Sequence, residues 1–130
     1  MFFFLHIILM ATAALGILAG VGAAIFLRGR RSWLNIHKYL NSFSLMIMLA
    51  GIIAGFIYVS NTNGEHIAGL HQLIGLTALN FSVATSFLGL YQFKAKNKSA
   101  VRTAHRWLGR FFMLLLLTAI TLGLILISIL

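Results

Sequence analysis

Five histidines are the side chains in this sequence best suited to bind a metal or to move a proton. They are His6, His37, His66, His71 and His105. The chain has no cysteine, and its only acidic residue is Glu65. Disulfides, thiolate ligands and thiol catalysis are therefore excluded, and imidazole is left as the main candidate ligand.

Four apolar segments position these histidines. Of the 130 residues, 61% are hydrophobic and 8% charged, whereas about a quarter of a soluble domain is charged. A membrane-crossing helix needs roughly 20 apolar residues, and segments 2–27, 33–59, 67–92 and 104–129 are long enough. Their short connections predict antiparallel neighbours. We therefore expect an all-α, up-down-up-down four-helix membrane bundle that forms a single domain over 1–130.

Charge is sorted between the connections. All ten Lys and Arg residues lie in or beside the first and third connections, and the second connection holds only Glu65. The positive-inside rule places the first and third connections in the cytoplasm, and both termini on the outer side. This pattern also explains the net charge of +9 without nucleic-acid binding. The start of the chain, MFFFLH, lacks a basic region, so we expect a retained span rather than a cleaved signal peptide.

The predicted topology sorts four histidines into two levels. His6 and His71 fall near the outer ends of the first and third helices, and His37 and His105 near the inner ends of the second and fourth. Helices that alternate in such a bundle lie diagonally, so each level offers two imidazoles that can hold one flat object from both faces. A single intramembrane histidine is often an interhelical hydrogen-bonding residue, but a pair at each level favours a functional role.

Small residues follow the histidines at fixed spacing. Gly55, Gly89 and Gly123 lie eighteen residues after His37, His71 and His105, a distance of five full turns on the same helical face. We interpret them as room for a second bulky cofactor at the opposite level. Gly75 and Gly109, four residues after their histidines, allow a flat ring to approach the backbone. Close helix packing through small residues is the alternative explanation.

Haem is the object that best fits two imidazoles per level. Two neutral imidazoles are too few for Zn²⁺ or Mg²⁺, whereas haem supplies four equatorial nitrogens and needs one or two axial ligands. The sequence contains no CxxCH motif, so two non-covalent haem b groups are expected. The candidate partners of the inner haem propionates are basic residues, namely Arg31, Lys38, Arg106 and Arg110. His66 is left as a propionate, quinone or proton partner, or as an interfacial residue.

Four phrases of the sequence resemble the cytochrome b561 family of transmembrane di-haem proteins. They are FLHIILMATAALGILAG, WLNIHKYLNSFSLMIMLAGIIAGF, GLHQLIGLTALNFSVATSFLGLYQF and TAHRWLGRFFMLLLLTAITLGL. The resemblance covers nearly the whole chain, and it implies that His6 pairs with His71, and His37 with His105, as axial ligands of two haem irons. Two flanking helices and a serine-rich phrase of the ascorbate-using members are absent, so the chain looks like a minimal microbial version in a prokaryotic plasma membrane.

The expected function is electron transfer across the membrane through two bis-histidine haems. The donor and acceptor classes left open are a quinol, an ascorbate-like reductant, a metal such as ferric iron, and another cytochrome. One alternative is a haem-bearing anchor subunit of a larger redox complex, and another is a haem-free transporter or assembly protein. The sequence leaves open whether the chain is itself a reductase and whether it forms a homodimer.

Overall fold

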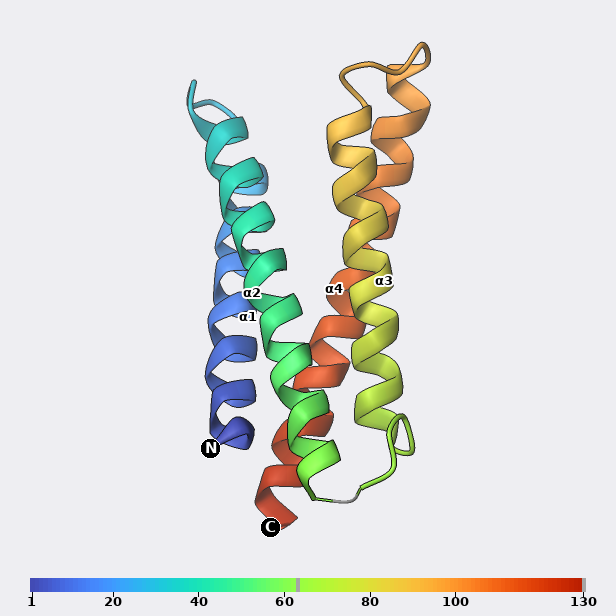
Figure 1. Ribbon diagram of the computed structural model, residues 1–130. Helices are drawn as coiled ribbons and strands as arrows, with labels where there is room; N and C mark the ends of the chain where they lie inside the picture. Colours follow the sequence, from blue (N-terminus) through green and yellow to red (C-terminus); the bar gives the residue numbers. More distant parts are fainter. Residues whose placement is uncertain (63, 130) are drawn as a thin grey trace. The chain divides into compact units, whose positions relative to one another are not determined.

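Four long helices make up the described part of the chain, residues 1–62 and 64–129, in the computed structural model (Figure 1). They are α1 (Phe2–Phe26), α2 (Trp33–Asn61), α3 (Leu70–Tyr91) and α4 (Lys98–Ile129). No strand occurs in these two described stretches. All four helices are long and apolar enough to cross a membrane. The prediction of an all-α chain with four membrane-length helices is confirmed.

Two helices begin at residues other than those predicted, and side-chain caps explain both. Helix α4 begins six residues earlier than expected because the Asn97 side chain accepts a hydrogen bond from Ala100 N at 3.0 Å, which satisfies an amide in the first turn. Helix α3 begins three residues later than expected. There the Gln72 side chain accepts hydrogen bonds from the backbone N–H groups of Ala68 and Gly69, which fixes the start of the helix.

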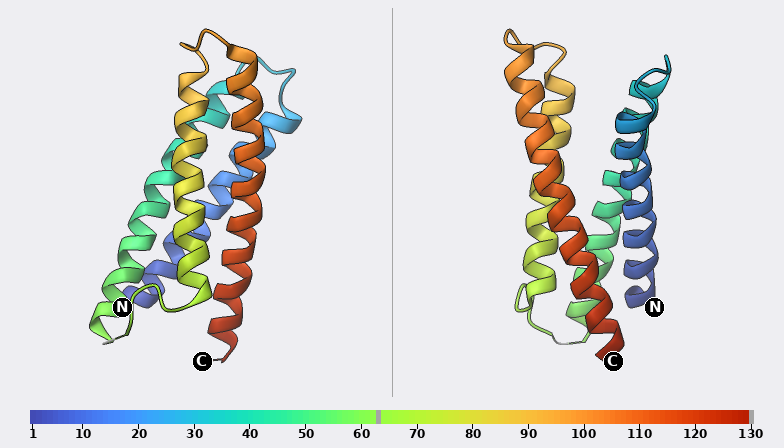
Figure 2. Two further views of the ribbon diagram at one scale, coloured as in Figure 1. Left: turned by 90° about the vertical axis from the view of Figure 1, so that its right-hand side faces the viewer. Right: turned by 180° about the vertical axis from the view of Figure 1, so that it is seen from behind.

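The helices form two antiparallel hairpins. Hairpin 1 (residues 1–66) contains α1 and α2, and hairpin 2 (residues 67–129) contains α3 and α4. Both views of Figure 2 show the two helices of each hairpin side by side. Each hairpin has its own contacts and its own pair of histidines. The expectation that the whole chain forms a single domain stays a prediction.

Hairpin 1 packs tightly because small residues face its seam. A Cβ added to Gly16 of α1 would collide with the Ser44 hydroxyl of α2, and one added to Gly51 would lie 2.9 Å from Met10 Sδ. Ser44 itself is buried. Small residues at such a seam let two backbones approach closely, which is how helices associate in lipid without a hydrophobic driving force.

Hairpin 2 uses larger side chains for the same purpose. The buried residues are Ala78 and Ser82 on α3, and Phe112, Leu116 and Ala119 on α4. Only 11% to 22% of the most apolar window in each of the four helices is buried. The remaining apolar side chains form an outward surface that suits lipid.

The two hairpins correspond residue by residue. His6, Gly20 and Ala24 of α1 correspond to His71, Thr85 and Gly89 of α3, with numbers that differ by 65 throughout. In the second helix of each hairpin the numbers differ by 68, so that His37 corresponds to His105, and Gly55 to Gly123. The offset changes by three because α4 begins seven residues before His105, whereas α2 begins four residues before His37.

Candidate functional site

Each histidine in a helix donates a hydrogen bond from its Nδ1 atom to a backbone carbonyl of the paired helix. In hairpin 1, His6 Nδ1 lies 2.8 Å from Gly51 O, and His37 Nδ1 lies 2.8 Å from Gly20 O. In hairpin 2, His71 Nδ1 lies 3.0 Å from Ala119 O, and His105 Nδ1 lies 2.8 Å from Thr85 O. All four imidazoles are partly buried. One hydrogen-bonding pattern therefore occurs four times.

The four accepting carbonyls share one spacing along the chain. Each belongs to the residue fourteen positions after the histidine of its own helix, as Gly20 follows His6 and Gly51 follows His37. Fourteen residues rise about 21 Å along a helix. Each hairpin therefore carries one histidine near each of its two ends, and the helices hold one another's imidazoles.

A small residue follows each accepting carbonyl by four positions. A Cβ added to Gly55 would lie 2.9 Å from His6 Nδ1, and one added to Gly89 would lie 3.0 Å from His105 Cε1. At Gly123 the nearest atom would be His71 Cε1, at 3.1 Å. Ala24 holds the corresponding position beside His37. These distances are too short for an ordinary Cβ contact, so the glycines give the imidazoles room to reach the carbonyls.

This arrangement gives the eighteen-residue spacing a local cause. The sequence analysis interpreted Gly55, Gly89 and Gly123 as room for a second cofactor on the same helical face. In the structure each glycine contacts the imidazole of the neighbouring helix in its own hairpin. In each of these helices the accepting carbonyl lies fourteen residues after the histidine, and the glycine lies four residues after that carbonyl. The two intervals add up to eighteen residues, which explains why the spacing repeats.

The hydrogen bonds fix the tautomer of each neutral imidazole. A carbonyl oxygen can only accept, so Nδ1 must carry the proton. The lone pair of the ring then lies on Nε2, the nitrogen that points away from that hydrogen bond. Metal-bound histidines commonly donate their other ring N–H to a backbone carbonyl, which orients the ring and raises its basicity. The four imidazoles thus have the donor chemistry of axial ligands.

Gly75 and Gly109 differ from the three glycines above. A Cβ added to Gly75 meets no described atom within 4 Å, and one added to Gly109 meets only Thr85 Cγ2, at 3.7 Å. Packing within hairpin 2 therefore does not require glycine at either position. The prediction that they let a flat ring approach the backbone is untested by these contacts.

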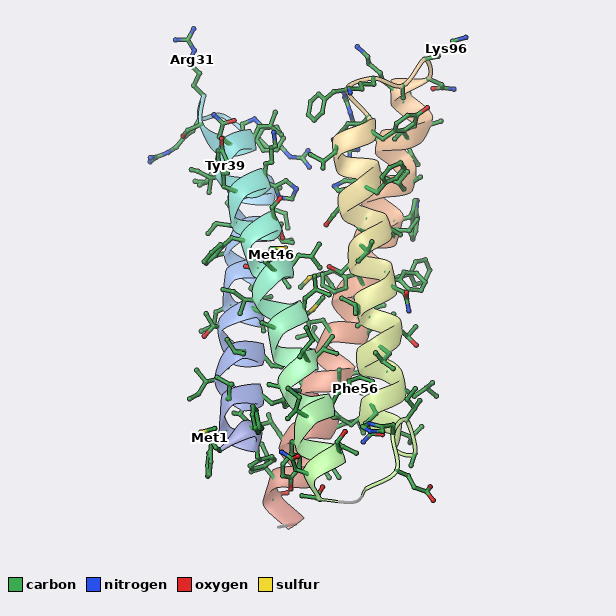
Figure 3. All side chains as sticks on the ribbon, in the orientation of Figure 1. Met1, Arg31, Tyr39, Met46, Phe56 and Lys96 are labelled. Atoms are coloured by element: carbon green, nitrogen blue, oxygen red, sulfur yellow. The ribbon has the colours of Figure 1, made fainter. Side chains whose placement is uncertain are left out.

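The predicted propionate partners are exposed. Arg31, Lys38 and Arg106 are all on the surface, and Figure 3 shows Arg31 at the end of hairpin 1 opposite Met1. Arg110 packs over the Trp107 ring, with its guanidinium carbon 4.7 Å from the ring centroid. The sequence offers only Glu65 as an acidic side chain for ten basic residues, so most of these cations are left available to an anion such as a propionate.

His66 lies in the connection that follows α2 and belongs to hairpin 1. Its ring stacks on Phe56, with centroids 5.1 Å apart and planes inclined by 15°. Its Nε2 lies 3.1 Å from Ser60 Oγ. His66 thus differs from the other four, which use Nδ1 against a carbonyl.

The sequence analysis missed the accepting carbonyls of Gly20, Gly51, Thr85 and Ala119, because any residue type can supply a carbonyl. The fourteen-residue spacing was the signal that could have found them. It also missed Asn41, whose amide nitrogen lies 3.1 Å from His37 Nδ1 and 2.7 Å from the His37 carbonyl oxygen. A polar residue one turn after a candidate ligand was the available clue there.

The comparisons with known proteins agree with the histidine pattern. A family model described as eukaryotic cytochrome b561 matches residues 2–129. The searches of curated proteins and of solved structures give no match. The family match covers all four helices, and therefore all four histidines that donate to carbonyls.

Proposed function

The chain belongs to the cytochrome b561 family, whose members transfer electrons across membranes by means of haem, and we propose that it holds two b haems, one near each membrane face. The proposed axial ligands are His6 with His71 at the outer level, and His37 with His105 at the inner level. Each pair takes one imidazole from each hairpin. The observation that carries the proposal is the Nδ1 hydrogen bond that all four histidines make to a backbone carbonyl.

The donor set fits a haem iron. When bound, haem supplies a one-electron iron couple, and two imidazoles fill its axial positions so that no position is open to oxygen. The protein itself supplies the orientation of the ligands. Carbonyls of the paired helices fix the imidazole rings, and Gly55, Gly89 and Gly123 let the rings approach those carbonyls. The levels of each hairpin lie about 21 Å apart along the helix.

Charge at the two ends sets the proposed orientation. The connections that contain Arg31 and Lys96 carry the basic residues and face the cytoplasm, as the positive-inside rule requires. Arg31, Lys38, Arg106 and Arg110 bind the propionates of the inner haem. Gly75 and Gly109 let the macrocycles lie against α3 and α4. The proposed location is a prokaryotic plasma membrane.

The redox partners lie on both faces of the membrane. They belong to the classes of a quinol, an ascorbate-like reductant, ferric iron or a second cytochrome. A second candidate function is a haem-bearing anchor subunit that passes electrons between a quinone and a soluble partner. The favouring observation is that the described residues form four membrane-length helices, as a membrane-embedded subunit requires.

Spectra of the purified protein test the proposal. Haem b with two imidazoles gives sharp Soret and α bands on reduction, and a His71→Ala variant is expected to lose about half of the haem. Colourless protein, or full haem content in that variant, would contradict the proposal. Co-purification of a partner subunit from the native membrane would favour the anchor function.

Single cysteines test the orientation because the natural chain has none. Cysteines placed at Arg31 and Lys96 are expected to react with a membrane-impermeant thiol reagent only after the cells are opened. A cysteine at Gly64 is expected to react in intact cells. The reverse pattern would overturn the orientation while leaving the haem ligands untouched.

A further inference from the structure

The two inner-level histidines have different neighbours one turn further along their helices. Asn41 stands four residues after His37, and the corresponding residue after His105 is Gly109. The Asn41 amide nitrogen donates to the His37 carbonyl oxygen at 2.7 Å and lies 3.1 Å from His37 Nδ1. Gly109 can make no such contact, so the imidazole of His37 alone has a carboxamide of its own helix beside it.

The residues whose carbonyls accept hydrogen bonds from these two histidines differ in side-chain size, and in the opposite sense. His37 donates to the carbonyl of Gly20, and His105 donates to that of Thr85. A Cβ at Gly20 would collide with the Asn41 amide nitrogen and lie 2.9 Å from its Cγ. In hairpin 2, Thr85 Cγ2 is the atom nearest to the space beside Gly109. The larger residue of the pair therefore lies on α2 in hairpin 1 and on α3 in hairpin 2.

The polarity of the position one turn after the histidine therefore differs between the hairpins. In hairpin 1 an amide N–H group lies beside the imidazole N–H. In hairpin 2 Gly109 supplies no side chain, and the atom nearest to the space beside it is the Thr85 methyl carbon, since the Thr85 hydroxyl donates to the Phe81 carbonyl oxygen at 2.7 Å. The reverse orientation of the Asn41 amide is unfavourable because it would place its oxygen against the His37 carbonyl oxygen. The amide thus presents its positive end to the ring.

We infer that Asn41 is a positioning residue that sets the ring orientation of His37 and raises the reduction potential of the inner haem. This inference rests on the proposed function, in which His37 is a ligand of that haem. A positive dipole near the ligand disfavours the more positive, oxidised state of the iron, and the polarity of the surroundings of a haem ligand is a known determinant of potential. The effect is strong in a membrane interior because the low dielectric screens it little.

Redox titration of the purified holoprotein tests the inference. The inner transition is identified as the one that disappears in His37→Ala. Asn41→Ala is expected to lower the midpoint of that transition, to leave the other unchanged, and to shift the largest low-spin ferric g value, which depends on the relative orientation of the axial rings. An unchanged midpoint and an unchanged g value would overturn the inference.

Asn80→Ala is the matched control. The Asn80 amide also donates to a carbonyl four residues earlier, Leu76 O at 3.0 Å, in the middle of a helix. It is exposed and nine residues from the nearest histidine in its helix. Both midpoints are expected to stay where they are. Equal shifts in the Asn80 and Asn41 variants would overturn the inference, because a general effect of removing an amide would then explain both.

A second substitution keeps the inference testable where Asn41→Ala loses haem. Asn41→Leu keeps a side chain of similar size without the amide dipole, and it is expected to lower the inner midpoint. An unchanged or raised midpoint in Asn41→Leu would overturn the inference. Absence of any haem transition in the natural protein would instead refute the proposed function, so the two failures are distinguishable.

Discussion

Hairpin 1 has Gly16 and Ser44 at the positions where hairpin 2 has Phe81 and Phe112. The close approach of Gly16 to Ser44 requires small residues, whereas Phe112 is a buried aromatic side chain. Both hairpins nevertheless present two histidines with the same Nδ1 hydrogen bonds and the same fourteen-residue spacing. The difference teaches that the seam of a hairpin can be repacked freely while the histidines and their carbonyls keep one geometry.

The largest expected effect comes from removing both histidines of one hairpin. If each haem takes one ligand from each hairpin, His6→Ala with His37→Ala removes a ligand from both haems and abolishes nearly all haem absorbance. His6→Ala with His71→Ala removes both ligands of one haem and leaves about half. Haem quantification of the purified variants measures this.

The opposite pattern of haem loss in the two double variants would contradict ligation of each haem by both hairpins. If the variant lacking both histidines of hairpin 1 kept half of the haem, each hairpin would hold its own haem. His66→Ala is the control, because the His66 ring stacks on Phe56 and its Nε2 lies near the Ser60 hydroxyl and not near a carbonyl of a paired helix. It is expected to keep the full haem content.

A smaller loss is expected when the room beside a histidine is filled. Gly55→Ala and Gly123→Ala each place a Cβ about 3 Å from an imidazole, at 2.9 Å and 3.1 Å from the nearest ring atom. Each imidazole must then move away from its carbonyl, so both variants are expected to weaken the outer haem and to shift its midpoint in the same direction. Retention of haem during dilution, followed by redox titration, measures the effect.

Gly22→Ala is the matched control for these two variants, since a Cβ there meets no described atom within 4 Å. Alanine is favoured over glycine in a helix interior by about 1 kcal/mol, so this variant is expected to be as stable as the natural protein or slightly more so. Normal haem retention in all three variants would show that the glycines do not serve the histidines.

The seam of hairpin 1 is expected to matter for stability and little for the spectrum. Gly16→Leu forces the helices apart at Ser44 and is expected to cost about 1–3 kcal/mol, as overpacking usually does. Gly22→Leu on the same helix is the control. The loss of helicity in a detergent titration measures this cost in unfolding free energy. Equal curves for the two variants would show that Gly16 does not contribute to the packing of the seam.

The smallest effect is expected at Ala24, the only one of the four small residues at this register that is not glycine. Ala24 lies four residues after Gly20, whose carbonyl accepts from His37, and the other three histidines have glycine at this register. Ala24→Gly is expected to keep both haems and to lose up to about 1 kcal/mol of helix stability. Gly89→Ala is expected to be the mildest of the glycine substitutions, because Gly89 is the position that corresponds to Ala24 in hairpin 1, although its added Cβ would lie 3.0 Å from His105 Cε1. A loss of haem in Gly89→Ala as large as in Gly55→Ala would contradict this ranking.

The sequence predicted the helices well because long apolar runs leave the backbone few alternatives in a membrane. It was less accurate at the starts of α3 and α4, where the side chains of Gln72 and Asn97 decide the first turn. The histidines were also found from the sequence, since imidazoles are rare inside membrane spans.

The contacts of the histidines were less predictable. Every residue has a backbone carbonyl such as Gly51 O, so the residue types do not show which carbonyls accept hydrogen bonds from the histidines. The eighteen-residue spacing of glycines was visible, but its cause lies in the neighbouring helix and not in the helix that carries it. Asn41 was overlooked because a single asparagine gains meaning only from its distance to His37.

The most direct measurement is a redox titration of the pure protein with haem and protein quantified in the same sample. The proposed ligation, with one imidazole from each hairpin on each haem, predicts two haem b groups per chain and two one-electron transitions. A single transition with one haem per chain, or a protein without haem, would contradict it.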